Sequence, residues 1–164
     1  MKLKALFALA AVGTLLIGPL PAEDKAKKKD PLKGIKCLMS GKQVVDCSVG
    51  FKGGKVYFCG GKCATAFEAD LKKEPADRKF TAKANHQLYA TKQAKLVQCA
   101  FTCKKLNSET VIEIAGTKVC FCCAKCKKKA EDAEDPVQAV FNDKQFKNGF
   151  KIAKKKEGKK AKKK

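Results

Sequence analysis

Six of the ten cysteines in this chain of 164 residues fall into two groups with nearly the same spacing. Each group has a first cysteine, a second about twenty residues later and a third four positions beyond it: Cys37, Cys59 and Cys63, then Cys99, Cys122 and Cys126. Three thiolates suit a trigonal Cu⁺ site, or a tetrahedral Zn²⁺ site that takes a fourth ligand. The spacing therefore predicts two sites for a thiophilic metal ion, with zinc and copper as the candidates.

The remaining four cysteines are candidates for extra ligands of these sites: Cys47, Cys103, Cys120 and Cys123. Alternate side chains of a strand share a face, which predicts that Cys120 lies on the same side as Cys122. Cys103 follows Cys99 by about one turn and is also within reach. The second group is thus rich enough in thiols for four-sulfur zinc coordination or a small multi-copper site, whereas the first has only Cys47 as an obvious addition.

The same cysteines allow two other interpretations. Exported proteins often use an even number of cysteines for disulfides, and Cys99 with Cys103 would close a short loop. Thiol redox chemistry is the third interpretation, because Cys123-x-x-Cys126 has the spacing of a redox motif. That motif follows a predicted hairpin, however, and no thioredoxin-like βαβ unit is evident. The duplicated spacing favours metal binding over both.

The two cysteine groups lie in segments that are similar to each other and about 62 residues apart, which indicates an internal repeat. Each segment passes through a β-branched stretch to a glycine, Gly53 or Gly116, and returns through Lys-Val-x-Phe-Cys. This pattern predicts a hairpin, and apolar residues at helical spacing after Cys63 predict a helix. A cysteine before the hairpin, one at the end of its return strand and one in the first helical turn would then converge on one point.

These segments resemble the TRASH and YHS families, which are small treble-clef-like modules associated with heavy-metal sensing and trafficking. In the TRASH pattern a first cysteine is followed after roughly twenty residues by Cys-x-x-x-Cys, and both groups match it. The resemblance covers about Ile35 to Pro75 and Val97 to Pro136, and it implies that the six cysteines bind metal. Such modules often begin Cys-Pro-x-Ser/Thr-Gly; here Leu38 and Ala100 replace the proline and Cys103 replaces the glycine. The Tyr-His-Ser residues of the YHS family are missing, which favours the TRASH comparison.

We therefore expect an α+β fold with two treble-clef-like modules, each a β-hairpin followed by a helix, joined by a helical connector and flanked by disordered basic termini. A module of about 40 residues rarely buries enough apolar surface to fold without a staple such as a metal ion. The expected organisation is a signal peptide over 1–22, a basic disordered arm over 23–34, the first module over 35–75, the connector over 76–96, the second module over 97–135, a terminal helical segment over 136–150 and a disordered poly-Lys tail over 151–164.

The N-terminus has the pattern of a secretory signal peptide. A short positive start precedes an uncharged stretch over residues 5–18, and Ala22 is a plausible small residue before a cleavage point. The stretch is too short to span a bilayer comfortably, and no later apolar run has membrane length. The sequence thus predicts an exported protein of the periplasm or cell envelope with no transmembrane segment in its mature chain.

The charge of the chain is strongly basic, with 37 Lys and Arg against 16 Asp and Glu and a formal net charge of +21. Such a chain attracts polyanions and anionic surfaces, above all through the lysine-rich tail. Arg78 is the only arginine, which argues against sequence-specific reading of nucleic acid bases. The rival to metal binding is therefore a disulfide-stapled polycationic protein that binds anionic envelope components or nucleic acid. No phosphate loop, Ser/His/Asp set or catalytic carboxylate pair stands out, so we expect no enzyme activity.

Overall fold

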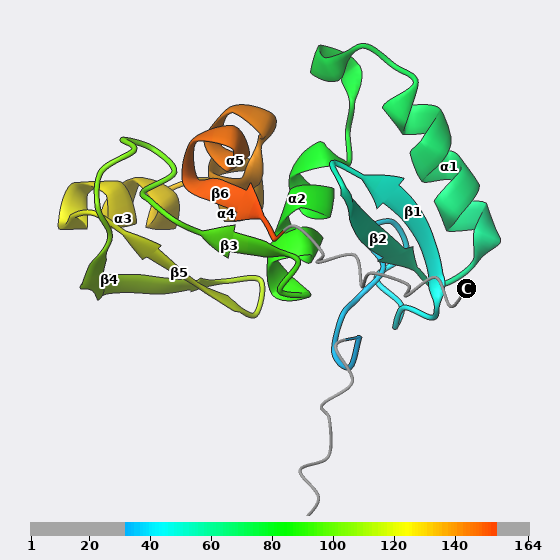
Figure 1. Ribbon diagram of the computed structural model, residues 1–164, viewed down its shortest axis with the longest axis horizontal. Coiled ribbons are helices and arrows are strands. Elements are labelled where there is room, and N and C mark those ends of the chain that lie inside the picture. The colour runs from blue at the N-terminus through cyan, green and yellow to red at the C-terminus, as the bar shows by residue number, and fades with distance from the viewer. Residues whose placement is uncertain (1–31, 154–164) are drawn as a thin grey trace, which may run out of the picture.

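The computed structural model describes residues 32–153 and shows a mixed α+β fold (Figure 1). The predicted signal peptide, most of the basic arm and most of the poly-Lys tail lie outside the described residues. The elements in chain order are β1 (Cys47–Phe51), β2 (Gly54–Phe58), α1 (Gly61–Leu71), the 3-10 turn η1 (Pro75–Asp77), α2 (Thr81–Ala90), β3 (Ala94–Leu96), β4 (Asn107–Ile114), β5 (Thr117–Phe121), α3 (Ala124–Glu131), α4 (Pro136–Phe141), α5 (Asp143–Gly149) and β6 (Phe150–Ile152).

A hairpin followed by a helix occurs twice, as predicted. Strands β1 and β2 pair antiparallel and α1 packs on them, while β4 and β5 pair antiparallel and carry α3. Both hairpin turns use two consecutive residues with positive φ, Lys52–Gly53 and Ala115–Gly116. Two such residues make the tight turn whose twist matches that of the flanking strands, and glycine adopts this conformation without steric cost. We refer to β1, β2 and α1 with the preceding loop as the first module, and to β4, β5 and α3 with theirs as the second.

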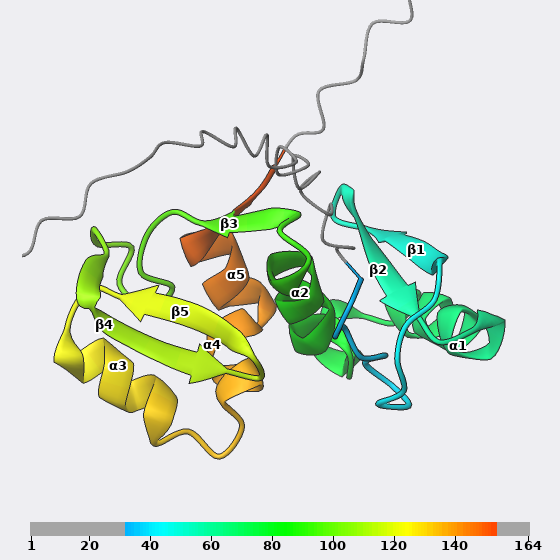
Figure 2. The same cartoon turned by 90° about the horizontal axis from the view of Figure 1, so that it is seen from below.

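Helix α2 lies between the two modules (Figures 1 and 2). The fully buried Asn85 accepts a hydrogen bond from Lys52 Nζ at 3.0 Å, in the turn of the first hairpin, and donates to the carbonyl of Phe141 at 2.8 Å. His86 contacts the turn of the second hairpin, with Nε2 3.2 Å from the carbonyl oxygen of Ile114 and 3.0 Å from Thr117 Oγ1. Two neighbouring residues of one helix therefore hold the two hairpin turns.

The connector and the terminal segment differ in detail from the prediction. The connector contains α2 but continues into β3, which pairs antiparallel with β6, so that Leu96 lies opposite Phe150. The terminal segment is two helices, because Asn142 ends α4 and its side chain accepts from the N–H of Gln145 to cap α5. Strand β6 runs to Ile152, two residues into the range expected to be tail.

Buried phenylalanines form the core of each part of the molecule. In the first module Phe58 and Phe67 are both fully buried, with ring centroids 5.3 Å apart. In the second, Phe101 stacks on the buried Phe121 at 5.7 Å. A third group joins α2 to the C-terminal elements: Tyr89, Phe141, Phe146 and Phe150. Burial of a phenylalanine side chain contributes roughly 1.5–3 kcal/mol, so each cluster helps to hold its own set of elements.

The outer edge of β2 is covered by two glutamine side chains. The amide of Gln87 accepts from the N–H of Tyr57 at 2.6 Å and donates to its carbonyl at 3.0 Å. The amide of Gln93 makes the same pair of bonds with Lys55, both at 2.7 Å. These side chains satisfy backbone groups that a third strand would otherwise pair. Among residues 32–153, no helix combines the length and the apolar character needed to cross a bilayer.

Candidate metal centres

The structure brings the sulfur atoms of each predicted trio together. All the Sγ atoms within a trio lie within 4.8 Å of one another, both for Cys37, Cys59 and Cys63 and for Cys99, Cys122 and Cys126. In each trio the first cysteine lies in a loop before the hairpin, the second directly follows the return strand, and the third lies in the first turn of the following helix. The two clusters are called the first and second centre below.

The loop that carries the first cysteine has the same hydrogen bonds in both centres. In the first, the N–H of Cys37 donates to the carbonyl of Lys42 at 2.7 Å, and the N–H of Gly41 donates to the carbonyl of Cys37 at 2.9 Å. The second loop repeats both bonds at 2.9 and 2.8 Å, with Cys103 at the position of Gly41. Gly41 has φ of 70° and Cys103 has φ of 57°, so Cys103 occupies a left-handed position that usually favours glycine.

A hydroxyl group contacts each centre from within the same loop. Ser40 Oγ lies 3.0 Å from Cys59 Sγ in the first centre, and Thr102 Oγ1 lies 3.1 Å from Cys122 Sγ in the second. The two residues occupy equivalent positions, three after the first cysteine of their trio. These hydroxyls were not among the predicted site residues, although the Ser/Thr of the family pattern falls at this position and is the signal that points to them.

The first centre holds its sulfurs in different protonation states. Burial raises the pKa of Cys37, but hydrogen bonds from the Ser40 side chain and from the backbone N–H groups of Ser40, Cys59 and Met39 outweigh it and lower the pKa to about 6. The neighbouring thiol of Cys59, burial and the proximity of Cys37 raise the pKa of Cys63 to about 11. At neutral pH the centre therefore has a ready thiolate at Cys37 and a thiol at Cys63.

The second centre has the same arrangement. Burial raises the pKa of Cys99, but the Thr102 hydroxyl and nearby backbone N–H groups outweigh it and lower the pKa to about 7. Burial, followed by the thiols of Cys122, Cys123 and Cys99, raises the pKa of Cys126 to about 12. Like charges in one site resist joint ionisation, and a bound cation would remove that resistance.

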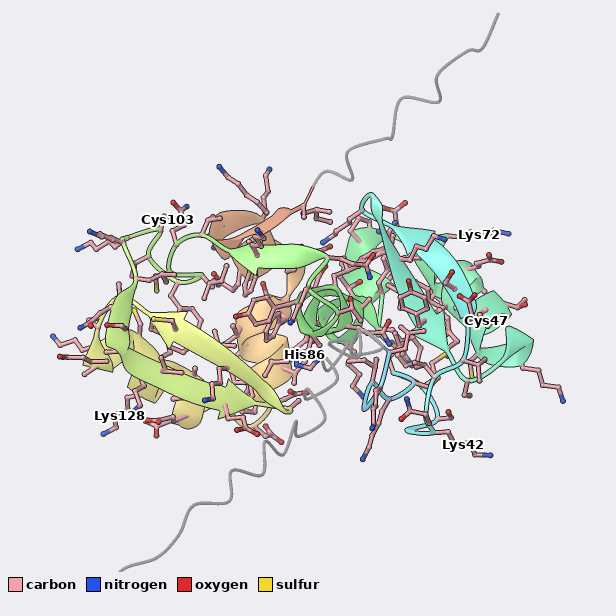
Figure 3. The ribbon with its side chains drawn as sticks, turned by 60° about the horizontal axis from the view of Figure 1, so that its bottom comes forward. Lys42, Cys47, Lys72, His86, Cys103 and Lys128 are labelled. Carbon is pink, nitrogen blue, oxygen red and sulfur yellow. The ribbon has the colours of Figure 1, made fainter. Side chains whose placement is uncertain are left out.

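The four further candidate ligands are placed differently. Cys123 is exposed and its Sγ lies 3.7 Å from Cys122 Sγ, at the edge of the second centre. Cys120 donates to the carbonyl of Asn107 at 2.8 Å and is not part of the second trio. Cys47 begins β1 and Cys103 is exposed, and neither joins a trio. Cys47 and Cys103 lie toward opposite ends of the molecule, with His86 between them (Figure 3). All ten cysteines of the chain lie in the described range, and all are free thiols.

The helices beside the two centres carry opposite charge. Helix α1 has one lysine, Lys62, and two acids. Helix α3 has one acid and four lysines over eight residues, at 125, 127, 128 and 129. The ammonium of Lys129 lies 5.1 Å from the ring centroid of Phe101, in the loop of the second centre. A cluster of thiolates therefore meets a more positive surrounding in the second module than in the first.

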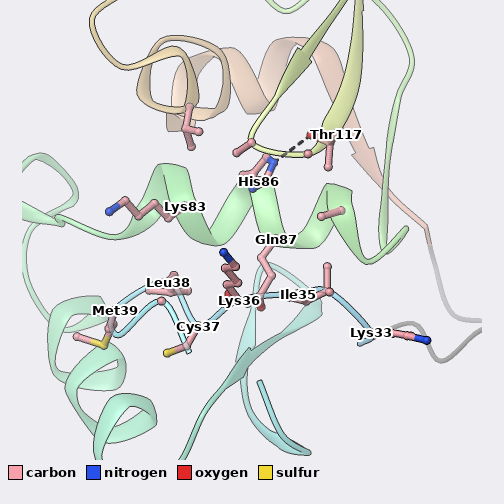
Figure 4. Close-up of a pocket in the computed structure, with 16 residues that line it drawn as sticks. Lys33, Ile35, Lys36, Cys37, Leu38, Met39, Lys83, His86, Gln87 and Thr117 are labelled. Carbon is pink, nitrogen blue, oxygen red and sulfur yellow. Dashed lines mark hydrogen bonds between the residues drawn. The ribbon is translucent and has the colours of Figure 1, made fainter. Parts of the chain in front are cut away.

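A groove of about 910 Å³ lies between the first module and the second, over α2 (Figure 4). Lys33 and Lys36 line it from the loop of the first centre, and Lys83 and His86 line it from α2. Cys37 belongs to the same lining, so this basic groove adjoins the first centre. Burial lowers the pKa of His86, which keeps this side chain neutral at the wall of the groove.

Each centre unites three thiols from a loop, a strand end and a helix start, with a hydroxyl beside them and one thiol of lowered pKa. Such a set of soft donors suits zinc or monovalent copper. Comparisons of the chain with protein-family models, with curated proteins and with solved structures found no match. The assignment of the two centres therefore depends on their own geometry and chemistry.

Proposed function

We propose that this protein binds a thiophilic metal ion, Zn²⁺ or Cu⁺, at each of its two cysteine centres. The observation that carries the proposal is the convergence of two separate trios of free thiols, each within 4.8 Å, at equivalent places in two hairpin–helix modules. Sulfur atoms around a tetrahedral zinc ion are about 3.8 Å apart when each Zn–S bond is about 2.3 Å. The distances Cys59–Cys63 and Cys122–Cys126, both 3.7 Å, agree with that value.

The small size of the modules supports the same proposal. The first module has its own aromatic core, but only a few large side chains are buried in it, such as Phe58 and Phe67. A metal ion that joins the loop, the strand end and the helix would supply the missing stability, as structural zinc does in other small units. On this proposal the two segments are copies of one TRASH-like module, with the six trio cysteines as ligands.

We further propose that the protein works outside the cytoplasm, where it buffers, delivers or senses its metal. The signal-peptide pattern at the N-terminus supports export, and the absence of a recognisable catalytic set supports a role without enzyme activity. Cys59 and Cys122 are only partly buried, so a partner's thiol or a chelator could approach the ion through them. Exchange of this kind is what buffering or delivery requires.

The test is a direct metal measurement. The chain is purified under reducing conditions, dialysed against Zn²⁺ or Cu⁺ and analysed by mass spectrometry for bound metal. We expect two ions per chain and protection of the trio thiols from alkylation. A triple Cys47→Ser, Cys103→Ser, Cys120→Ser variant is the matched control, and it should keep both ions.

Two results would contradict the proposal. A chain that holds no zinc or copper after reduction has no metal centre of the kind described here. Near-zero reactive thiols in the metal-free chain from its native compartment would instead support the disulfide-stapled polycation. Binding of that protein to an anionic surface would weaken steeply with salt.

A further inference from the structure

The two centres differ at the residue that directly follows the second cysteine. In the second module this residue is Cys123, at the N-cap of α3, and in the first it is Gly60, at the N-cap of α1. Cys123 has φ of −163° and ψ of 165°, and Gly60 has φ of 164° and ψ of 171°. Both are extended backbone, so the modules place this residue in the same way and differ only in its side chain.

The side chain of Cys123 lies beside the second trio. Its Sγ is 3.7 Å from Cys122 Sγ, the same distance that separates Cys122 from Cys126. The thiol of Cys123 also interacts with that of Cys126. Every edge of a sulfur tetrahedron around zinc is about 3.8 Å long. The Cys122–Cys123 and Cys122–Cys126 distances match two of these edges, so they fit a fourth ligand at Cys123. Cys123 is outside the set of sulfurs that all lie within 4.8 Å of one another, so its exposed side chain would rotate to complete the tetrahedron.

The charge around the second centre fits one more thiolate. Four thiolates around Zn²⁺ carry a net charge of about −2, whereas three carry about −1. Helix α3, which carries Cys126, has four lysines, and Lys129 Nζ lies 5.1 Å from the ring centroid of Phe101 in the loop that holds Cys99. The helix beside the first centre lacks this positive charge, because α1 has a single lysine and the acids Glu68 and Asp70. Nearby positive charge stabilises the thiolate form and therefore the more anionic site.

We propose that Cys123 is the fourth ligand of the second centre, which makes it a closed four-sulfur site suited to zinc, while the first centre keeps three sulfurs and an open position. This inference rests on the proposed function and adds to it the difference between the sites. A closed four-sulfur zinc site is typically structural, and an open three-sulfur site leaves room for exchange or for three-coordinate Cu⁺. The first centre is thus the site of transfer, and the second holds its module together.

The first experiment compares two exposed cysteines in the full chain. The zinc-loaded and the metal-free protein are alkylated with N-ethylmaleimide, and each cysteine is followed by peptide mass spectrometry. Zinc should slow alkylation of Cys123 by about tenfold or more, together with its trio, because a metal-bound thiolate is a poor nucleophile. Cys103 is also exposed and belongs to no trio, so its rate should not change.

The second experiment exchanges the residues at the differing position. A Cβ at Gly60 would meet no heavy atom within 4 Å, so Gly60→Cys fits without steric conflict, and Cys123→Gly restores the residue of the first module. X-ray absorption on the two-zinc chain should give about 3.5 sulfur atoms per zinc, falling to about 3 in Cys123→Gly and rising to about 4 in Gly60→Cys. Circular dichroism of the zinc-loaded variants verifies that both are folded.

The outcomes separate this inference from the function on which it rests. If zinc protects Cys99, Cys122 and Cys126 but Cys123 reacts at its metal-free rate, the fourth ligand is wrong and the metal function stands. An unchanged sulfur count in Cys123→Gly leads to the same conclusion. If zinc protects no cysteine at all, the proposed function fails and the fourth ligand fails with it.

Discussion

The two modules have the same backbone plan and place different chemistry on it. Both have a hydrogen-bonded loop, a tight hairpin turn with two positive φ angles and a helix that begins beside the third cysteine. They differ in side chains at equivalent positions: Gly60 of the first module corresponds to Cys123 of the second, and Gly41 corresponds to Cys103. The same backbone therefore brings three sulfurs together in both modules, while the side chains around them differ.

The modules also differ in how they are supported. The second loop is packed against α5, because Gly149 is so close to Ala100 that a Cβ there would lie 2.8 Å from Ala100 Cα. In the first loop, a Cβ at Gly34 or Gly41 would meet no heavy atom within 4 Å. Instead the first module is anchored through its hairpin turn, where Lys52 pairs with Asp143 and bonds to Asn85. Asp143 and Gly149 are the two ends of α5, so this helix contacts both modules, and we expect only changes at Gly149 to act mainly on the second centre.

The largest expected effect comes from removing one sulfur from each module in turn. Cys59→Ser should lose the first ion and destabilise its own module, and Cys122→Ser should lose the second ion with a larger effect on its module, because metal binding and folding are coupled in such units. Structural zinc contributes about 10–16 kcal/mol to the folding of small zinc peptides that have a full set of ligands. We expect each variant to retain no zinc in its altered centre at micromolar zinc. Metal counting with NMR of each module reads the result. Loss of both ions from either variant would mean that the modules do not bind independently.

The pH dependence of binding should have the same sign in both centres. The pKa of Cys63 is raised to about 11 and that of Cys126 to about 12, so both thiols are protonated at pH 7 and must release a proton to the solvent when metal binds. Apparent affinity should therefore rise by at least about tenfold per pH unit per centre between pH 6 and 8. Titration with a competing chelator measures the affinity, and calorimetry in two buffers counts the protons. A flat profile would contradict these protonation states.

A substitution in α5 should separate the two centres. Gly149→Ala places a methyl group against the backbone of Ala100, and overpacking of this kind costs about 3 kcal/mol when neither side can yield. We expect weaker metal binding at the second centre and unchanged binding at the first. Gly50→Ala is the control, because a Cβ at Gly50 meets nothing within 4 Å. Equal weakening of both centres would show that the modules are coupled through α2.

Asp70, in α1 of the first module, allows a test of the stability of that module. Its buried carboxylate accepts from the N–H groups of Lys79 and Phe80 and pairs with Lys73 at 3.3 Å. Burial raises the pKa of Asp70, but these donors outweigh it and the pKa falls below its ordinary value. The carboxylate therefore stabilises the fold above about pH 4, and this contribution is lost as the pH falls through the lowered pKa.

Asp70→Asn should accordingly lower the free energy of unfolding by about 2 kcal/mol at neutral pH, since it weakens several buried hydrogen bonds. Denaturation of the metal-loaded chain measures this difference. The deficit should shrink in acid, where the wild-type carboxyl group is also protonated. The exposed Asp77 in η1 provides the control, and Asp77→Asn should change stability little. A deficit that does not depend on pH would contradict the role of the charge.

The smallest effect is expected at the hydroxyl groups. Ser40→Ala and Thr102→Val remove the side-chain donors that lower the pKa of Cys37 and Cys99, so both pKa values should rise. One hydrogen bond of this kind is worth about 1 kcal/mol. The pH dependence of alkylation in the metal-free chain gives each pKa directly. Each variant should raise only the pKa of the cysteine in its own module.

Much of the site could be predicted from the sequence because its signals are local and occur twice. Glycine turns, β-branched strands and the Cys-x-x-x-Cys spacing each report on a few neighbouring residues, and together they predicted the hairpins, helices and trios. Strands β3 and β6 are three residues long and pair across the chain, so neither carries a periodic pattern that reveals it. Their pairing depends on how α2 and α5 pack, which no local pattern encodes.

The position of Cys120 shows a second limit. Strand alternation predicted that Cys120 and Cys122 share a face, but β5 ends at Phe121 and the rule does not extend beyond it. In addition, the pairing of β4 with β5 changes register between Asn107 and Val111, and the Cys120 thiol donates to the carbonyl of Asn107. Four residues of β4 pass there against one of β5, and such an irregularity has no reliable sequence signal, so the face of this thiol could not be predicted.

The glutamine pair on β2 has a consequence for the chain when no metal is bound. A two-stranded hairpin is marginally stable in water, and its unpaired edge can recruit a second molecule. Gln87 and Gln93 imitate a neighbouring strand at Tyr57 and Lys55, and they come from α2 and the residues after it, not from a centre. While α2 stays docked, intermolecular sheet growth along β2 is blocked even when the first centre is empty. On the proposed function, a chain that has released its ion would keep this edge of β2 covered.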